Sequence, residues 1–225
     1  MKENKIKEFW NWMWKSESIL SYLVFLILVF IFIKFIFLPG LSLIFGMGLT
    51  GLPLAIVESS SMEHYSLSEC TNAENNYCTS YSDYYVLCGK RLDKKEYFNL
   101  DEYWQICGNW YESNYNLSLE QFSKFPLKNG FRKGDIMVIW GWKTPEIGDV
   151  IVFRTSLKTP IIHRIVSLTP LATKGDHNPT QLTYSNYVLD ETNINQEQVI
   201  GVAIARIPYL GWPKILLADL IKRIF

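Results

Sequence analysis

Three consecutive serines, Ser59 to Ser61, lie in the stretch ESSSMEH at 58–64. A serine hydroxyl is a weak nucleophile at neutral pH and needs a general base to take its proton. His163 is a candidate base, because it lies in PIIHRIVSL at 160–168, where apolar neighbours predict a buried strand. Burial keeps an imidazole neutral and ready to accept a proton, although a histidine in such a strand is more often a core residue.

An acidic partner for His163 could come from TKGDHNP at 173–179. Asp176 lies there in a Gly-Asp turn just after the His163 strand, and its carboxylate could reach back to a ring nitrogen. That contact would fix the tautomer and stabilise the imidazolium formed during proton transfer. The alternative is that Asp176 only hydrogen-bonds its own turn. Lys174 is a conceivable base of a Ser–Lys dyad, but its position in the turn favours a structural role.

Several short motifs occur together in the order found in type I signal peptidases. They are ESSSMEH, then KGDIMVI and GDVIVF, then HRIV, then TKGDHN and finally VIG with IPYLG. The chain thus resembles the archaeal and endoplasmic-reticulum branch of this S26-type serine peptidase family, over roughly residues 19–65 and 130–213. The resemblance implies a mostly β catalytic domain that cleaves signal peptides from exported preproteins on the outer face of the membrane. It implies no cofactor and no metal.

The resemblance assigns roles to individual residues. Ser61 aligns with the nucleophile, and its backbone N–H, with the Ser59 hydroxyl as a helper, would form the oxyanion hole. His163 aligns with the general base. Ser60 stands where the family usually has glycine and His64 where it has proline, and neither change removes a catalytic group.

The acidic partner implied by the resemblance can be placed in two ways. The family has an aspartate in the Gly-Asp turn and a second one six residues later, where this chain has Leu182. Counting backwards from VIG, Asp190 has the usual distance to Val199, and a loop insertion within 178–189 would reconcile the two counts. Asp190 is then the expected partner of His163, with Asp176 a supporting carboxylate in the same site.

The elements that must position these residues begin with an apolar segment. Residues 19–38 carry one charge, and their length matches the ~20 residues that cross a ~30 Å hydrocarbon core. Because Pro-Gly follows, and not a small-residue cleavage site, we expect a retained anchor. We predict a single span with residues 1–18 in the cytoplasm and the catalytic domain outside. Residues 41–57 could form a second span, but their glycines and Pro53 favour a path along the bilayer into a strand.

The rest of the chain predicts a mainly β domain with an insertion. Residues 39–65 form a membrane-proximal segment that leads to the nucleophile. Residues 131–213 form the β catalytic core, with antiparallel strands predicted at 134–142, 148–156, 160–168 and 198–208 and a hairpin joining the second to the third. The last segment, 214–225, is amphipathic and too short to span, so it packs on the domain or lies on the membrane surface.

The insertion, residues 66–130, is predicted to be small, helical and tied by disulfides. Helix starts are indicated by NLDE at 99–102 and SLEQ at 118–121. Four cysteines follow the anchor, which favours two disulfides of open pairing; zinc is less favoured because the spacings contain no C-x-x-C pair. The cysteines are Cys70, Cys78, Cys88 and Cys107.

Composition narrows the choice of partners. With 22 basic and 22 acidic side chains, the chain lacks the basic excess typical of nucleic-acid binding. The predicted partners are signal peptides of secretory preproteins and the lipid bilayer, with the protein-export channel as a further candidate. Two alternatives stay open: an anchored extracellular binding module and a narrow-specificity processing peptidase. A Ser61 hydroxyl more than ~5 Å from both ring nitrogens of His163 would favour the binding module.

Overall fold

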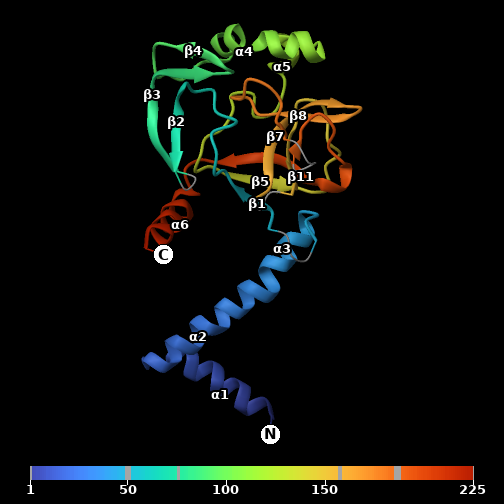
Figure 1. The fold of residues 1–225 in the computed structure, drawn as a ribbon. Helices are drawn as coiled ribbons and strands as arrows, with labels where there is room; N and C mark the ends of the chain where they lie inside the picture. The colour runs from blue at the N-terminus through green and yellow to red at the C-terminus, as the bar shows by residue number, and fades with distance from the viewer. Residues whose placement is uncertain (1, 49–51, 75–76, 157–158, 185–188, 225) are drawn as a thin grey trace. The chain divides into compact units, whose positions relative to one another are not determined.

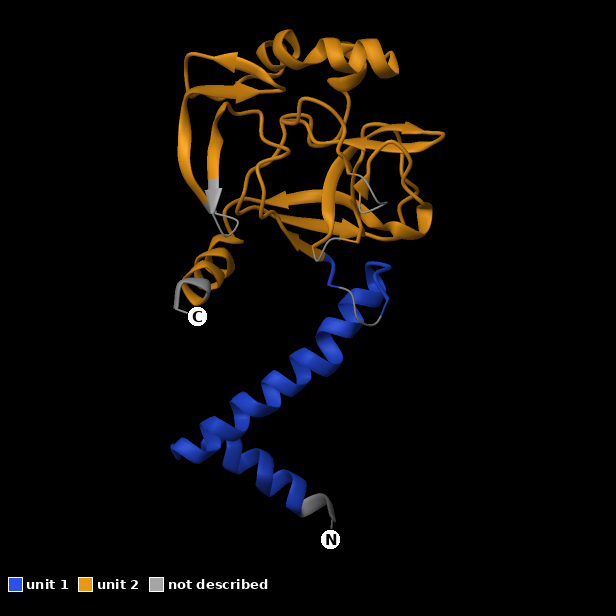
Figure 2. Cartoon of the chain, viewed as in Figure 1, with its two compact units in different colours: residues 1–53 blue, residues 54–225 orange. Residues whose placement is uncertain are grey.

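The computed structural model describes residues 2–48, 52–74, 77–156, 159–184 and 189–224. The chain divides into two compact units, residues 1–53 and 54–225, which are coloured separately in Figure 2. Each is described by itself below.

The first unit is helical. It contains α1 (Lys2–Lys15), α2 (Ile19–Phe32), a π-helical turn (Ile33–Phe37) and α3 (Leu38–Ile44). Among the described residues, the continuous helix Ile19–Ile44 is long and apolar enough to cross a membrane.

The apolar helix continues past its predicted end at Leu38. The helix passes through Pro39, which has no backbone N–H and would crowd the preceding turn of a regular α-helix. The wider π-helical turn lies directly before it, and the Leu38 N–H bonds to the Ile33 carbonyl. A local change of helix type therefore accommodates the proline, and the apolar stretch after it is partly helical.

The second unit is built on a curled sheet of antiparallel strands in the order β1–β5–β11–β6–β7–β8. All four predicted strands are present as β5, β6, β7 and β11, and β6 pairs with β7 as the predicted hairpin. The mainly β fold is therefore confirmed. The strand bounds are β1 Leu54–Ile56, β5 Ile136–Trp140, β6 Val150–Phe153, β7 Ile161–Leu168, β8 Leu171–Lys174 and β11 Val199–Ile207.

Curling brings the two ends of this sheet together. Ser61 follows β1 and His177 follows β8, at opposite ends of the strand order. Nevertheless the His177 N–H donates to the Ser61 carbonyl at 2.8 Å. The inner side is filled by apolar residues of β6, β7 and β11, among them Ile151, Ile165 and Val202, all fully buried. The curl is thus what places the serine turn beside the end of β8.

The insertion has the two predicted helices and a sheet that was not predicted. The helices are α4 (Leu100–Tyr115) and α5 (Leu119–Phe122), and each begins with a capping box, at Asn99 and Ser118. The sheet has the order β2–β3–β4. Most of β2 and β3 is polar and interrupted by register shifts, so no period-2 apolar pattern marks these strands. Their bounds are β2 Leu67–Glu74, β3 Tyr77–Leu87 and β4 Lys90–Leu92.

All four cysteines pair within the insertion, as expected. Cys70 bonds to Cys78 across the β2–β3 hairpin, and Cys88 bonds to Cys107 of α4. The thiolates that a zinc site would need are therefore consumed.

The remaining elements follow β8. They are the short hairpin β9 (Thr183–Tyr184) and β10 (Leu189–Asp190), a 3₁₀ turn (Gln196–Gln198) and α6 (Trp212–Ile224). In Figure 1, α4 and α5 lie on one side of the second unit and α6 on the opposite side. The helix α6 contacts the unit through buried Ile215, while Leu216, Leu217 and Leu220 are exposed.

Candidate active site

Ser61 and His163 are in direct contact although 102 residues separate them in the chain. The Ser61 hydroxyl lies 2.8 Å from Nε2 of His163. Ser61 sits in a half-buried turn after β1, and His163 is buried in the middle of β7. This distance is within the range for proton transfer and well below the ~5 Å separation that would favour a binding module.

The other ring nitrogen of His163 binds a glutamate. Nδ1 of His163 is hydrogen-bonded to Oε1 of Glu191, whose side chain is fully buried. Thr173 donates its hydroxyl to the same oxygen at 2.8 Å, and the Leu182 N–H donates to Oε2 at 2.7 Å. The carboxylate is thus held on both oxygens and fixes the orientation of the imidazole. The arrangement Ser61–His163–Glu191 has the connectivity of a nucleophile, a base and an orienting acid.

The β9–β10 hairpin explains how Glu191 reaches this position. Leu182 occupies the place where the resemblance implies a second aspartate. The hairpin leaves the site after Leu182 and returns at Glu191, whose backbone N–H donates to the Leu182 carbonyl at 3.0 Å. The two residues are therefore neighbours in space. The loop insertion expected within 178–189 corresponds to this hairpin, of which residues 185–188 lie outside the described part of the chain.

Asp190 does not contact His163, contrary to the expectation. Its side chain is exposed, and Oδ1 accepts hydrogen bonds from the N–H and the hydroxyl of Thr192, at 2.9 and 2.6 Å. Successive side chains of an extended segment point to opposite sides. Leu189 and Glu191 are buried and Asp190 between them faces outward. The count along the sequence therefore missed the carboxylate at His163 by one residue.

Asp176, like Asp190, binds residues other than His163. It forms a bidentate ion pair with Arg164, with Nε at 2.9 Å and Nη2 at 2.7 Å from the two carboxylate oxygens. Arg164 follows His163 in β7, so the two side chains lie on opposite faces of the sheet. The turn after β8 directs Asp176 to the face of Arg164, which is why it is not available to His163.

The Asp176 carboxylate is stabilised in its charged form. Burial by itself would raise the pKa of Asp176, but Arg164 and the hydrogen bond from His64 hold that pKa well below its usual range. The carboxylate accepts a hydrogen bond from Nε2 of His64 at 3.1 Å. Burial lowers the pKa of His64, and its ring stacks on Tyr103 with centroids 3.6 Å apart. His64 therefore belongs to the Asp176 group and not to the Ser61 group.

The turn at residues 175–178 closes directly on the serine. Besides the bond from the His177 N–H to the Ser61 carbonyl, Nδ1 of His177 lies 3.2 Å from the Glu63 carbonyl. Gly175 leaves no room for a side chain, because a Cβ there would lie 2.8 Å from both His163 Nε2 and the Ser61 carbonyl oxygen. The glycine of TKGDHNP is thus required by close approach to the site.

The other candidate residues lie around this centre. The Ser59 hydroxyl is 3.2 Å from the Ser61 hydroxyl, close enough to assist it. Lys174 is fully buried, and its ammonium donates to the Gly175 carbonyl at 3.0 Å and lies over the rings of Trp110 and Tyr111. Burial lowers the pKa of Lys174 to about 8. These contacts agree with the structural role expected for Lys174.

Comparisons with known proteins agree with the resemblance to signal peptidases. The chain is 30% identical over 103 residues to a "Signal peptidase complex catalytic subunit SEC11" of Metarhizium robertsii, covering 41% of this chain and 59% of the relative. A protein of the same description from Pyrenophora tritici-repentis is 33% identical over the same coverage. Over the aligned part, the chain is similar in sequence to signal peptidase catalytic subunits. It spans about 59% of the length of these relatives. No protein-family model matches the chain.

Two features of this site were not predicted from the sequence. Glu191 was missed because the resemblance directed attention to aspartates, and the adjacent acids Asp190 and Glu191 carry no pattern in the sequence that tells which of them faces inward. The contacts from α4 of the insertion to Asp176 were also missed. Their signal in the sequence is the spacing of four between Tyr103, Cys107 and Tyr111, which puts all three on one helix face.

Proposed function

We propose that this chain is a membrane-bound serine endopeptidase that removes signal peptides from exported preproteins. The observation that carries the proposal is the hydrogen-bonded series from the Ser61 hydroxyl through His163 to Glu191. The homology to signal peptidase catalytic subunits supplies the substrate class.

The geometry supports an acyl-enzyme mechanism. The Ser61 hydroxyl attacks the scissile carbonyl while Nε2 of His163 takes its proton. Glu191 holds Nδ1–H of the ring and stabilises the imidazolium that forms. The Ser61 backbone N–H, assisted by the Ser59 hydroxyl, stabilises the oxyanion; one such donor is typically worth about 2.7–4 kcal/mol in the transition state. His163 then protonates the leaving amine, and water activated by His163 releases the acyl-enzyme.

The substrate binds as an extended strand against a strand edge of the catalytic domain. Small pockets receive the small residues one and three positions before the cut, the pattern of signal-peptide cleavage sites.

The helix Ile19–Ile44 supplies the membrane anchor, with the N-terminus in the cytoplasm and the second unit on the extracytoplasmic face. The relatives are named as subunits of a signal peptidase complex, so accessory subunits and the protein-export channel are candidate partners.

Cleavage of a preprotein in detergent by Ser61→Ala and wild-type protein tests the proposal. Loss of the nucleophile removes the covalent route, so we expect the rate to fall by about 10⁴-fold or more. A variant that cleaves at the wild-type rate would overturn the mechanism. A panel of unrelated preproteins separates general signal-peptide removal from a narrow processing activity, because a general enzyme cleaves most of the panel.

A further inference from the structure

We propose that α4 of the insertion is a positioning element for the active site, acting through the turn at residues 175–178. The proposal rests on the proposed function for its catalytic consequence. Its structural part, that α4 holds this turn in place, stands on contacts that do not depend on the reaction.

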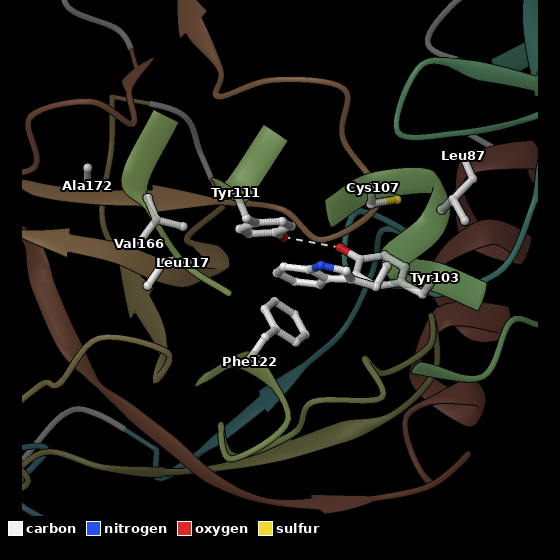
Figure 3. Packing of buried hydrophobic residues seen from close by; sticks show 9 residues of the cluster. Leu87, Tyr103, Cys107, Tyr111, Leu117, Phe122, Val166 and Ala172 are labelled. Carbon is white, nitrogen blue, oxygen red and sulfur yellow. Dashed lines mark hydrogen bonds between the residues drawn. The ribbon is translucent and has the colours of Figure 1, made fainter. Parts of the chain in front are cut away.

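One face of α4 points at the turn. Tyr103, Cys107 and Tyr111 are spaced by four residues, so they lie above one another along the helix. In Figure 3 the hydroxyls of Tyr103 and Tyr111 are directed toward each other and joined by a hydrogen bond of 3.1 Å. Each of these three side chains is almost completely buried. The face therefore belongs to the interior of the second unit and not to its surface.

The two tyrosines of this face hold Asp176 by separate atoms. Tyr103 donates its hydroxyl to the Asp176 backbone carbonyl at 2.8 Å, and the Tyr111 hydroxyl lies 3.2 Å from Oδ1 of the same residue. Burial raises the pKa of both phenols well above the usual value, so each keeps its proton as a donor. The ring of Tyr103 also stacks on His64, three residues after Ser61.

The disulfide Cys88–Cys107 adds a third connection. It joins α4 to Cys88, directly after β3, and the Cys88 N–H donates to the His177 carbonyl at 3.0 Å. His177 in turn donates its own N–H to the Ser61 carbonyl. A continuous series of covalent and hydrogen bonds therefore runs from α4 through Cys88 and His177 to the backbone of the nucleophile.

This series bears on catalysis because the Ser61 backbone is part of the chemistry. The orientation of the Ser61 peptide units determines where its hydroxyl and its N–H point. An error of about 1 Å in such groups lowers the rate by about 10²-fold. The insertion thus contributes to activity through Tyr103, Tyr111 and Cys88, which act as positioning residues.

The first test compares Tyr103→Phe and Tyr111→Phe with Tyr84→Phe. The phenylalanine variants keep the buried rings and remove only the hydroxyls. Tyr84 is a matched control in the same insertion, because its hydroxyl donates to Glu69 at 2.7 Å on the exposed sheet. We expect hydrogen–deuterium exchange of the 175–178 amides in the full-length protein to accelerate about fivefold in the first two variants and to stay unchanged in the third.

The catalytic arm of this test measures kcat and KM for a preprotein in detergent. We expect kcat to fall about fivefold in Tyr103→Phe with KM unchanged, because the substrate pockets are not altered. Exchange at 175–178 that matches the control would overturn the proposal. Faster exchange with unchanged kcat would also overturn it, since the turn would then be held without consequence for the reaction.

The two disulfides provide a second, independent comparison. We expect the double variant Cys88→Ser/Cys107→Ser to accelerate exchange at 175–178 more than tenfold, and Cys70→Ser/Cys78→Ser to leave it within about twofold. Equal acceleration in both would mean a general loss of stability and would overturn the proposal. Exchange decides whether α4 holds the turn even if no preprotein is cleaved, whereas the Ser61→Ala comparison decides the proposed function.

Discussion

Two histidine–carboxylate pairs lie close together in the second unit, and they differ in what the rest of each pair touches. His163 binds Glu191 through one ring nitrogen and the Ser61 hydroxyl through the other. His64 binds Asp176 through Nε2, but its Nδ1 is buried and has no hydrogen-bond partner within the described residues. The first pair has a reacting group at its end, and the second does not.

The carboxylates differ in the same way. Glu191 is held by neutral donors, Thr173 and the Leu182 N–H, so its charge remains available to the imidazolium of His163. Asp176 is already neutralised by the bidentate ion pair with Arg164. In the proposed mechanism, a buried His–Asp contact is therefore not by itself a catalytic pair. His163 has the Ser61 hydroxyl on its second ring nitrogen and a carboxylate partner that is held by neutral donors.

Replacement of the two histidines separates the pairs most strongly. We expect His163→Ala to lower kcat/KM for a preprotein by about 10⁴-fold, because no other group takes the proton of Ser61. His64→Ala removes a hydrogen bond and a stacked ring, and we expect a loss of about tenfold or less with an unchanged pH profile. Parallel kinetics of the two variants measure this. A larger loss in His64→Ala than in His163→Ala would show that His163 is not the base.

Replacing each acid by its neutral amide is expected to give the next largest effect. Glu191→Gln keeps the shape of the side chain but removes the charge that stabilises the imidazolium, so we expect kcat to fall about 10²- to 10⁴-fold. Asp190→Asn changes an exposed neighbour that binds Thr192, and we expect a change below about twofold. Equal losses in the two variants would contradict the assignment of Glu191.

Lys174 lies near the carboxylates of Asp176 and Glu191. Its titration gives a test by pH, with a smaller expected effect. Because burial lowers its pKa from 10.5 to about 8, the folded protein loses this proton at a lower pH than the unfolded chain does. The unfolded state therefore binds more protons between these values, and stability rises with pH. A shift of this size corresponds to a gain on the order of 3 kcal/mol.

We expect this rise to be absent in Lys174→Met. The stabilities of the wild-type and variant proteins are measured by unfolding in detergent between pH 7 and 10. The titration of all other groups cancels in the difference between the two stabilities. Parallel pH curves for the two proteins would show that Lys174 keeps an ordinary pKa in the fold.

Much of the β core was predictable because its signals are local. The β-branched runs bounded by Gly, Pro and Asp correctly predicted β5, β6, β7 and β11, and the capping boxes at Asn99 and Ser118 predicted α4 and α5. The strands β2 and β3 were not predicted, since Leu87 is the one buried side chain among their described residues and no alternating pattern results. The helix end at Leu38 was misplaced because a π-helical turn offsets the effect of Pro39.

The sequence by itself determined the nucleophile and base candidates, because Ser61 and His163 stand in motifs whose order is specific. It also determined that the cysteines would pair, since their even number behind an apolar segment indicates disulfides. Which carboxylate meets His163 was decided by the tertiary structure alone. The alternation of side chains in β7 sends Asp176 to Arg164, and the β9–β10 hairpin returns the chain so that Glu191, and not Asp190, faces inward. A difference of one residue reverses the direction of a side chain, and only the folded chain establishes that register.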